Sequence, residues 1–480
     1  MSELNQLFIG GDLSGIQKFI YNISSKKAAV SLKGRSYYLK QYMEGVCERI
    51  IESVNKSGAT KTDTIYCSGG KFYIITDNSE KITSAINLCY EQLKKELWEE
   101  HMGQLGLNIA YTPFNEQPNG SIDVDDGKNQ KPGILWKIVN EKFAKQKNQK
   151  FKELISNDFQ NFFNPILVGG NINVCAITGI ESPNCVKLDN DGDDMFVLPS
   201  VKKQIELGED LRNKQHFKTF EDYADETYLG ILRMDVDGLG KRFIEGFASI
   251  AEYKVFSNNL VKFFEEEVPN FQKEQGFTTH LNIIYAGGDD LFVVGRWDKV
   301  IDFAERIQLE TKKRFQKEGI SISGGIAIVN AKFPIAKAAE MAGEAEDNAK
   351  HYNNGEKNAF HFLGNSVSWN KEFDYVKDYQ QRFCKIISQN ALSKGILHKI
   401  MLYASIAKNN KKRIAEGKTP DYSYKWHLCY YLARYKKRYS GNAIVQNFCN
   451  ELNAQLASND RNLEKMALSA RWAELLLKQS

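Results

Sequence analysis

One pattern of elements occurs twice in this chain of 480 residues, and this internal repeat constrains the fold more than any other feature. Each copy predicts a strand, a helix, a β-hairpin, a helix, a strand and a helix. When Asp12 is aligned with Asp235, Gly15 falls on Gly238. Matched landmarks at a fixed order indicate a duplicated unit. The chain is therefore predicted to be an α+β protein with two ferredoxin-like palm domains, in which helices cover one face of a mostly antiparallel sheet.

The elements of the first copy can be placed by periodicity and turn residues. Strand 7–9 opens it, and Ser14 is predicted to be the N-cap of the next helix. A helix at 36–54, a hairpin at 64–76, a helix at 81–100, a strand at 105–111 and a helix at 134–149 follow. Residues 112–132, rich in Pro, Gly, Asn and Asp, predict a loop. The second copy has strands at 229–234 and 320–329, a hairpin at 281–296, and helices starting near 241 and 334.

Two adjacent carboxylates stand at the hairpin of the second copy, in the sequence Gly287-Gly288-Asp289-Asp290. Such carboxylates repel each other unless a cation lies between them, and Mg²⁺ prefers carboxylate oxygens. Asp235, at the end of the first strand of this copy, completes a predicted catalytic and metal-binding group with Asp289 and Asp290. A solvated turn is the alternative interpretation of the hairpin.

The first copy differs at this hairpin. There Gly69-Gly70 aligns with the two glycines of the second copy, so Lys71-Phe72 aligns with the two aspartates. A palm with a lysine at this place cannot gather the carboxylates that hold two divalent ions. We therefore predict one catalytic palm and one degenerate, non-catalytic palm, with a purely structural duplication as the alternative.

Four domains are expected from these patterns: a first palm at 1–150, an inter-palm linker at 151–226, a second palm at 227–364 and a C-terminal helical bundle at 365–480. The linker contains an acidic run at 189–194, which is predicted to be a solvated loop because no glutamate occupies the closing position of a calcium loop. Apolar residues at helical spacing, with almost no strand signal, predict the bundle.

Basic clusters in the bundle, at 411–413 and 436–438, lie near six tyrosines: Tyr422, Tyr424, Tyr430, Tyr431, Tyr435 and Tyr439. Basic residues beside aromatic rings suit contact with an RNA backbone and stacking on bases. A plain solvated surface is the alternative. The net charge of +4 is too small to indicate nucleic-acid binding by itself.

Targeting signals and the common motifs of metal hydrolases are absent from the sequence. No apolar run has the length of a membrane span, and the polar start of the chain is unlike a signal peptide. Eight cysteines without a C-x-x-C pair favour reduced thiols, so a cytoplasmic protein without a membrane is expected. No H-E-x-x-H occurs either.

Several motifs in order make the chain resemble the large, polymerase-like subunit of type III CRISPR effector complexes, in its Csm-type form. The matching stretches are G-D-L-S-G-I-Q-K-F-I-Y at 11–21, L-K-G-R-S-Y-Y-L at 32–39, Y-C-S-G-G-K-F-Y at 66–73, L-G-I-L-R-M-D-V-D-G-L-G-K at 229–241, Y-A-G-G-D-D-L-F-V-V-G at 285–295, S-G-G-I at 323–326, and A-x-x-A-E-x-x-A-K ending at Lys350.

The resemblance implies an ATP-dependent cyclase that makes cyclic oligoadenylates when its complex holds a matched target RNA. It implies two Mg²⁺ or Mn²⁺ ions on the three aspartates, ~3.5–4 Å apart, and contact of Lys350 with the triphosphate. Further expected nucleotide-binding residues are Gly287, Gly288, Asp237, Gly238, Ser14 and Gly15. Gly287 and Gly288 are expected to leave room for the nucleotide. For Asp237 the alternative is a structural role in shaping the turn. The degenerate palm is expected to hold the acceptor ATP near Ser14 and Gly15.

The resemblance also implies partners: guide RNA, target RNA, and the small helical and backbone subunits of a ribonucleoprotein complex. Family members commonly begin with an HD nuclease domain, but the palm motif starts at Phe8 and no His-Asp dipeptide occurs, so no HD nuclease is predicted. Zinc is doubtful, since Cys175-Ala176-Ile177-Thr178 replaces a C-x-x-C and Cys185 stands alone. A cyclic-dinucleotide synthase, an AMP-conjugating enzyme and a catalytically silent scaffold remain alternatives.

Overall fold

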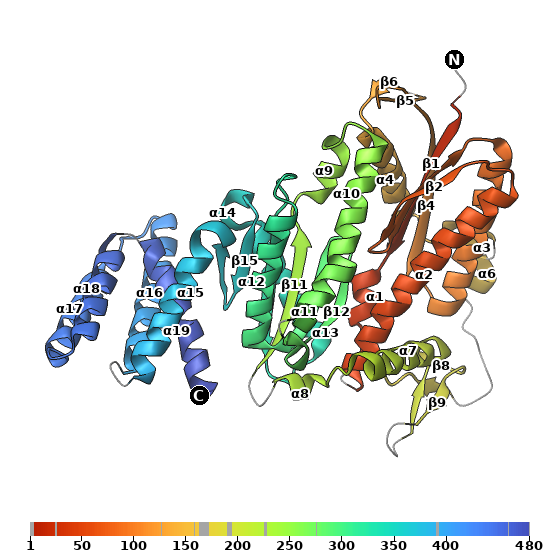
Figure 1. Ribbon diagram of the computed structural model, residues 1–480. Helices are drawn as coiled ribbons and strands as arrows, with labels where there is room; N and C mark the ends of the chain where they lie inside the picture. The colour runs from red at the N-terminus through yellow and green to blue at the C-terminus, as the bar shows by residue number, and fades with distance from the viewer. Residues whose placement is uncertain are drawn as a thin grey trace. The chain divides into compact units, whose positions relative to one another are not determined.

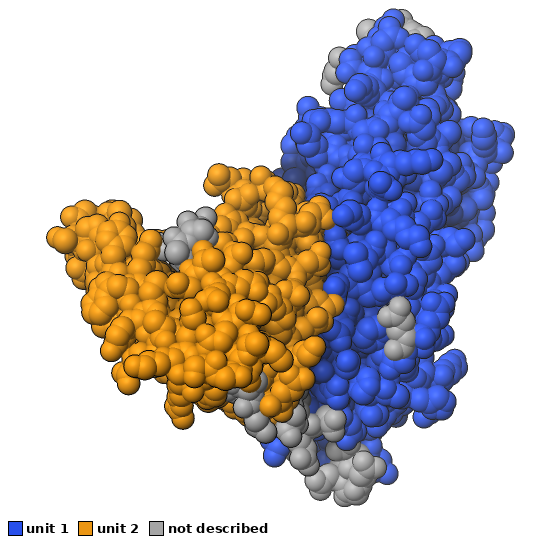
Figure 2. Space-filling view, turned by 60° about the vertical axis from the view of Figure 1, so that its left-hand side comes forward, with its two compact units in different colours: residues 1–321, 328–342 blue, residues 322–327, 343–480 orange. Residues whose placement is uncertain are grey.

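The computed structural model describes residues 4–24, 26–125, 127–157, 159–162, 172–189, 194–224, 228–274, 276–389, 393–458 and 460–479. Contacts divide the chain into two compact units, coloured separately in Figure 2: residues 1–321 with 328–342, and residues 322–327 with 343–480. Within the described part, no helix is both long and apolar enough to cross a bilayer.

The first palm is built on a six-stranded antiparallel sheet with the order β2-β3-β1-β4-β5-β6 (Figure 1). Its strands are β1 (Gln6–Ser14), β2 (Thr62–Ser68), β3 (Lys71–Asp77), β4 (Gly106–Glu116), β5 (Ile122–Val124) and β6 (Gly127–Gln130). Strand β1 pairs with β3 on one side and β4 on the other, and it is buried from Leu7 to Leu13. This central position explains the apolar run at its start.

Four helices complete the first palm: α1 (Ile16–Tyr21), α2 (Ala28–Lys56), α3 (Glu80–His101) and α4 (Gly133–Lys147). Helix α2 contacts β2 and β3, while α4 contacts β1 and β4. Ser79 caps α3 by accepting a hydrogen bond from the Ile82 amide, which satisfies a free N–H of the first turn.

The second palm repeats this arrangement. Its sheet has the order β12-β13-β11-β14-β15-β16, so the first four strands stand in the same order as β2-β3-β1-β4. The strands are β11 (Leu229–Val236), β12 (Leu281–Gly287), β13 (Asp290–Arg296), β14 (Ile322–Val329), β15 (Ala359–Phe362) and β16 (Asn365–Ser368). Both hairpins also carry an irregularity at the same place, before Tyr66 and before Tyr285. The predicted α+β fold with two palms is confirmed.

The helices of the second palm are α9 (Leu239–Glu245), α10 (Ile250–Lys262), the π-helix η1 (Phe263–Glu267), α11 (Val268–Glu274), the short 3₁₀ helix η2 (Phe277–Thr279), α12 (Trp297–Arg314), α13 (Ile335–Lys350) and α14 (Tyr352–Gly355). Ser249 caps α10 through the Glu252 amide. The π-helix widens one turn between α10 and α11 and places the charged side chain of Glu265 next to the first palm, where it accepts from Ser68.

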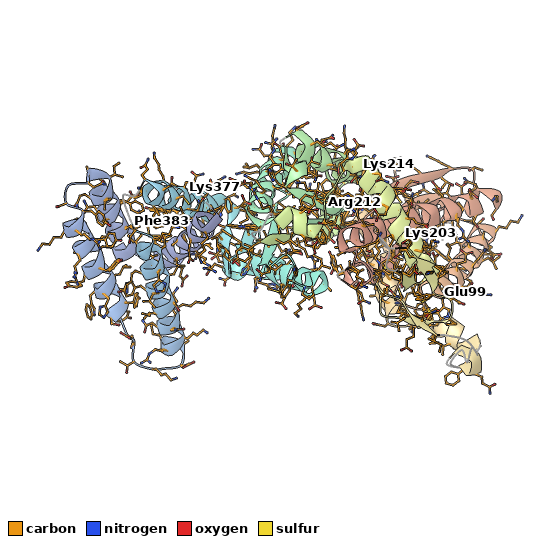
Figure 3. The ribbon with its side chains drawn as sticks, turned by 90° about the horizontal axis from the view of Figure 1, so that it is seen from below. Glu99, Lys203, Arg212, Lys214, Lys377 and Phe383 are labelled. Atoms are coloured by element: carbon orange, nitrogen blue, oxygen red, sulfur yellow. The ribbon has the colours of Figure 1, made fainter. Side chains whose placement is uncertain are left out.

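The segment between the palms contains more regular structure than expected. It includes α5 (Lys152–Asn157), α6 (Phe159–Phe162), short strands β7 (Asn173–Val174), β8 (Glu181–Ser182), β9 (Val186–Leu188) and β10 (Met195–Val197), then α7 (Pro199–Gln215) and α8 (Phe220–Ala224). Helix α7 carries Lys203, Arg212 and Lys214 (Figure 3) and packs along α2. The acidic run at 189–194 lies mostly outside the described residues.

The helical bundle consists of α15 (Asp374–Ser388), α16 (Gly395–Ala415), α17 (Ser423–Arg438), α18 (Ala443–Ser458) and α19 (Asp460–Gln479). Helix α19 packs between α15 and α16, and α17 lies beside α18 (Figure 1). Phe383 is in the centre of the core (Figure 3), together with residues from all five helices. Leu392, another apolar residue of this region, lies outside the described residues.

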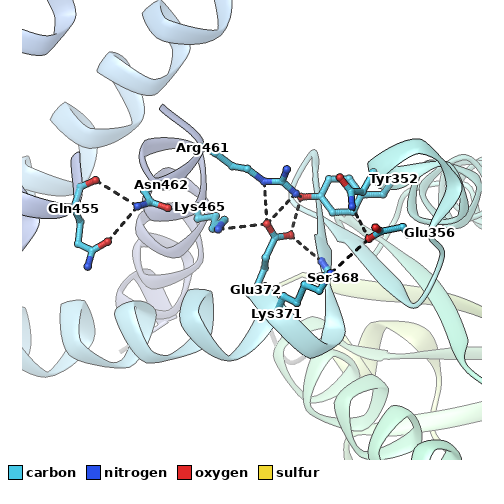
Figure 4. Close-up of polar contacts among 10 residues, drawn as sticks. Tyr352, Glu356, Ser368, Lys371, Glu372, Gln455, Arg461, Asn462 and Lys465 are labelled. Carbon is cyan, nitrogen blue, oxygen red and sulfur yellow. Dashed lines mark hydrogen bonds and ion pairs between the residues drawn. The ribbon is translucent and has the colours of Figure 1, made fainter. Parts of the chain in front are cut away.

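A buried carboxylate anchors the start of the bundle (Figure 4). Glu372, in the π-helix η3 (Trp369–Phe373), accepts hydrogen bonds from the Tyr352 hydroxyl at 2.7 Å and from Arg461 Nε at 3.0 Å. Lys465 Nζ lies 3.3 Å away. Burial acts to raise the pKa of Glu372, but the donors outweigh it and hold that pKa below its usual value. The carboxylate is therefore charged at neutral pH and ties η3 to α19.

Three expectations about local structure are wrong. Ser14 does not cap α1: it ends β1, and its hydroxyl donates to the Gly106 carbonyl at 2.9 Å, while Gly15 holds the N-cap position with a φ of 91°. The stretch 112–132 is not only loop, because β4 runs on to Glu116 and β5 and β6 follow. Strand structure also continues past residue 365, as β16.

Candidate functional site

Three carboxylates of the second palm meet at one end of its sheet. Asp235 lies near the end of β11, directly opposite Asp290, the first residue of β13. Asp289 precedes it in the turn, and its carbonyl accepts a hydrogen bond from the Val236 amide at 3.1 Å. Each of the three side chains offers an oxygen, and these oxygens lie within 4.8 Å of one another. Strand pairing therefore brings Asp235 together with residues that are 54 and 55 positions away in sequence.

These carboxylates line a cavity of about 600 Å³ that reaches into the first palm. Ser14, Gly15 and Gly69 of the first palm line its other side. Five further charged side chains line it: Asp12, Lys18, Lys71, Lys147 and Arg233. Cations opposite a carboxylate cluster suit a ligand that carries several phosphates together with metal ions. The volume lies within the usual range for small-molecule sites, about 300–1,000 Å³.

The first palm has a different set of side chains at the equivalent positions. Asp12 lies directly opposite Lys71 in the pairing of β1 with β3. Asp12 is buried, and its carboxylate forms an ion pair with Lys147, whose Nζ lies 2.8 Å away. One acidic residue between two lysines cannot form the cluster seen in the second palm.

The strand register corrects the alignment of the two hairpins by one residue. Ser68 pairs with Lys71 across the first turn, and Gly287 pairs with Asp290 across the second. Gly69 therefore corresponds to Gly288, and Gly70 takes the position of Asp289. The alignment based on sequence alone matches the two glycine pairs directly, and it therefore aligns Asp290 with Phe72. The strand register aligns Asp290 with Lys71 instead.

The two hairpin turns touch each other. A Cβ on Gly288 would lie 3.0 Å from the Gly69 Cα and 3.0 Å from the Tyr66 hydroxyl, and Gly288 has a φ of +65°. The Ser68 hydroxyl accepts a hydrogen bond from the Gly288 amide at 2.9 Å. The space beside Gly288 is thus filled by the first palm, and neither Gly287 nor Gly288 lines the cavity of the aspartates. Their expected role at the nucleotide stays a prediction.

Two half-buried tyrosines stand beside the turns at equivalent positions. Burial raises the pKa of Tyr66 well above its usual value, and the nearby Asp289 carboxylate adds to this. Burial does the same to the pKa of Tyr285, with Asp290 as the main charged contributor. Both phenols therefore stay protonated beside the acidic cluster.

The remaining predicted nucleotide-binding residues fall into different surroundings. Gly238 has a φ of 69° and begins α9, as Gly15 begins α1. Asp237 holds the turn, because its amide donates to the Ser321 carbonyl at 2.9 Å and its carboxylate accepts from the Ser321 hydroxyl at 2.7 Å. Neither Asp237 nor Gly238 lines the cavity.

Lys350 is the last residue of α13, and its ammonium lies 2.6 Å from the buried Glu346 carboxylate one turn earlier. Lys350 belongs to the second compact unit and the three aspartates belong to the first. Its contact with a triphosphate therefore remains a prediction.

Sequence reasoning missed the structural roles of the L-K-G-R stretch in α2. Lys33 is half-buried, and its ammonium donates to the Ile283 carbonyl in β12 at 2.5 Å. Desolvation of the ammonium lowers the pKa of Lys33 to about 8. A Cβ on Gly34 would lie 1.8 Å from the Gln204 carbonyl of α7. Arg35 donates to the Phe19 and Asn22 carbonyls at the end of α1. The signal available in the sequence was the L-K-G-R stretch itself, in which a glycine stands between two basic residues.

Elsewhere in the described residues, no comparable group of three potential metal ligands is found. The three aspartates are the single group of three potential ligands found close together in those parts of the chain. All eight cysteines are free thiols, with Cys175 buried and Cys185 partly buried. The acidic trio supplies oxygen ligands, which fit Mg²⁺ or Mn²⁺ better than softer metals.

Comparison with known families agrees with this double-palm fold. Residues 5–165 match the family described as Csm1 subunit domain B, and residues 228–361 match the second palm domain of Cas10/Cmr2. Together these matches cover both palms. The fold and the acidic cluster define a palm protein of the nucleotidyl cyclase-like class.

Curated relatives point the same way. The CRISPR system single-strand-specific deoxyribonuclease Cas10/Csm1 of subtype III-A from Enterococcus italicus is 28% identical over 421 residues, which cover 73% of this chain and 53% of that protein. Its counterpart from Methanocaldococcus jannaschii is 24% identical, with 76% and 60% covered. The chain thus spans a little over half the length of these relatives. Its two palms are thus similar to those of Cas10/Csm1 proteins.

Solved structures share the fold. The Csm1–Csm4 cassette in complex with cA4 has a TM-score of 0.65 at 20% identity and matches 89% of this chain and 65% of the solved chain. The cassette with AMPPNP has a TM-score of 0.64 at 20% identity, with 86% and 64% covered. At this identity the likeness supports the fold alone.

Proposed function

We propose that the chain is the subunit of a type III CRISPR effector that joins ATP molecules into cyclic oligoadenylates when target RNA is bound. One observation carries this proposal: the cavity beside Asp235, Asp289 and Asp290 is lined by residues of both palms, and several of these residues are cations. Two nucleotides need such a composite site, since one supplies the hydroxyl and the other the triphosphate. Related Csm1–Csm4 cassettes have been solved with ATP, with cA3 and with cA4.

The reaction forms a bond between the 3′ oxygen of one ATP and the α-phosphorus of another, and breaks the bond to pyrophosphate. Two Mg²⁺ or Mn²⁺ ions, when bound by the three aspartates, would stabilise the attacking and leaving oxygens. Lys71, Lys147 and Arg233 neutralise phosphate charge from the cavity walls. Ser14 and Gly15 lie where the acceptor ATP would enter, and Lys350 is proposed to contact the triphosphate.

The first palm is proposed to bind nucleotide without catalysing the reaction, because Lys71 stands opposite Asp12 where the second palm has Asp290 opposite Asp235. The division into four domains, at residues 150, 226 and 364, is kept as part of this proposal. Guide RNA, a Csm4-type backbone subunit and small helical subunits are the proposed partners; a Csm1–Csm4 subcomplex has been solved for a related type III-A complex.

The experiment is a synthesis assay with the assembled effector, ATP and Mg²⁺, with and without matched target RNA, followed by mass analysis of products. We expect cyclic oligoadenylates with target RNA in the wild type, and none with Asp289→Ala plus Asp290→Ala although the complex still assembles. Synthesis by the double variant would reject the site. Products limited to cyclic dinucleotides or AMP conjugates would support the other enzymatic alternatives, and no product under any condition would support a scaffold.

A further inference from the structure

An aromatic stripe runs along the outer face of α17 in the helical bundle. Tyr422 at the N-cap, Trp426 and Tyr430 follow each other at intervals of four residues, so their side chains lie on one face, about 6 Å apart along the axis. Their side chains are 53%, 60% and 61% exposed, respectively. Three large rings in a row facing solvent are unusual for a helix that already has a complete buried face.

The buried face of α17 does not need these rings. Tyr424, Leu428, Leu432 and Tyr435 fill the core on the opposite side of the helix. Tyr431 and Tyr439 pack against the same core. Four of the six tyrosines that the sequence grouped with the basic clusters therefore stabilise the bundle, and the exposed stripe consists of the other two together with Trp426.

The surroundings of the stripe are strongly basic. Residues 395–442, which form α16, α17 and the adjoining turns, contain eleven Lys and Arg but only two acidic residues, Glu416 and Asp421. The whole chain has a net charge of +4, so this segment is far more basic than the average. Charge of one sign on a single hairpin of helices favours a polyanionic partner.

Cations accompany the rings along the helix. Lys425 Nζ lies 5.5 Å from the centre of the Tyr422 ring, and the Arg434 guanidinium lies 5.8 Å from that of Tyr430. The exposed side chain of Lys437 continues the same face. His427 stacks on Trp426 with ring centres 3.6 Å apart. Rings and cations thus alternate within reach of one extended strand.

We propose that this face of α17, formed by Tyr422, Trp426, Tyr430, Arg434 and Lys437, binds single-stranded RNA. Unpaired bases can stack on the rings while the cations neutralise the phosphates, and this combination is typical of single-strand binding. A duplex keeps its bases stacked inside and offers nothing to the rings. The tyrosine hydroxyls and the imidazole can hydrogen-bond a 2′-hydroxyl, which favours RNA over DNA. A protein partner would find a less complementary surface, since excess positive charge surrounds the apolar rings.

The test measures binding of a short, unstructured, fluorescently labelled RNA by the full chain, without ATP. Trp426→Ala plus Tyr430→Ala should weaken binding by at least about 30-fold, because stacking contributes ~1–3 kcal/mol per base and two rings are lost. Trp426→Phe plus Tyr430→Phe should stay close to the wild type, since rings remain. Ile444→Ala, which removes an exposed apolar side chain of α18, is the matched control and should change nothing.

Charge reversal gives a second readout. Arg434→Glu plus Lys437→Glu should flatten the salt dependence, reducing the slope of log K against log salt by about 1.4, the value for two phosphate contacts on a single strand. Unchanged RNA affinity in the double alanine variant, with an unchanged melting temperature, would overturn the proposal. Equal or tighter binding of DNA with the same sequence would overturn the choice of RNA. Loss of a protein subunit from the alanine variant while RNA binding persists would also overturn it. Because no nucleotide is turned over, these outcomes are independent of the cyclase assay.

Discussion

The first palm places Asp12 opposite Lys71, whereas the second palm places Asp235 opposite Asp290. Both pairs stand at the same point of the same strand order, β2-β3-β1-β4 and β12-β13-β11-β14. In the first palm, Lys147 neutralises the remaining carboxylate. In the second palm, three carboxylates lie within 4.8 Å, and such a cluster is unfavourable without cations. The comparison shows that a shared backbone can support opposite local charge, which depends on two adjacent positions of the hairpin: Gly70 and Lys71 in the first palm, Asp289 and Asp290 in the second.

The largest expected effect comes from exchanging equivalent carboxylates for amides. Asp235→Asn should lower the rate of oligoadenylate synthesis by at least about 100-fold, because an amide is a weaker ligand and leaves the charge of bound ions uncompensated. Asp12→Asn is the matched variant in the first palm and should cost less than about 10-fold, since it removes one ion pair. Initial rates under saturating ATP provide the measurement. Equal losses in both variants would mean that the palms do not differ in the proposed way.

A smaller effect is expected from reversing a charge in the first palm. Lys71→Asp should raise the KM for ATP by about 10-fold and alter kcat less, because it removes a cation that lines the cavity and adds a like charge near Asp12. Lys81→Asp, at an exposed position of α3, is the control and should leave both constants unchanged. A KM unaffected by Lys71→Asp would remove the first palm from the nucleotide site.

The contact between the two turns can be tested with two glycines that share a positive φ. Gly288→Ala should lower the free energy of unfolding by roughly 2 to 4 kcal/mol, because the new Cβ adds a backbone clash with Gly69 to the cost of its conformation. Gly238→Ala meets nothing within 4 Å and should cost only about 1 kcal/mol. Chemical denaturation of both variants gives the comparison. Similar losses would show that the turns do not pack against each other.

The smallest effect concerns Lys33, which connects α2 of the first palm to β12 of the second. Its pKa is about 8 in the folded protein and near 10.5 when unfolded, so between these values the unfolded chain binds the extra proton. Stability relative to Lys33→Met should therefore rise with pH above 8, by about 1 kcal/mol per unit at most. Melting temperatures at pH 7.5 and pH 9.5 test this.

Lys81→Met is the exposed control for the same titration, and its difference from the wild type should not change with pH. A difference for Lys33→Met that is also constant across this range would contradict the burial of the Lys33 ammonium.

The order of elements and the acidic group were predictable, because strand and helix periodicity, the two glycines and the paired aspartates are local signals. The equivalence of the two hairpins was harder to predict from the sequence. The strand pairing, and not the position of the glycines, shows that Gly70 corresponds to Asp289. The ion pair of Lys147 with Asp12 and the contact of Ser68 with Glu265 join residues far apart in sequence, and no local pattern marks them. The helix cap at Ser14 failed for a related reason, since pairing with β4 extends β1 through that residue.

The most direct test of the account counts bound Mn²⁺ by electron paramagnetic resonance, in the assembled effector with a non-hydrolysable ATP analogue. The wild type and Asp12→Asn should bind Mn²⁺ with the same stoichiometry, whereas Asp235→Asn should lose most of it. If Asp235→Asn retains the wild-type stoichiometry, or if Asp12→Asn loses ions to the same extent, the assignment of the cations to the second palm alone is contradicted.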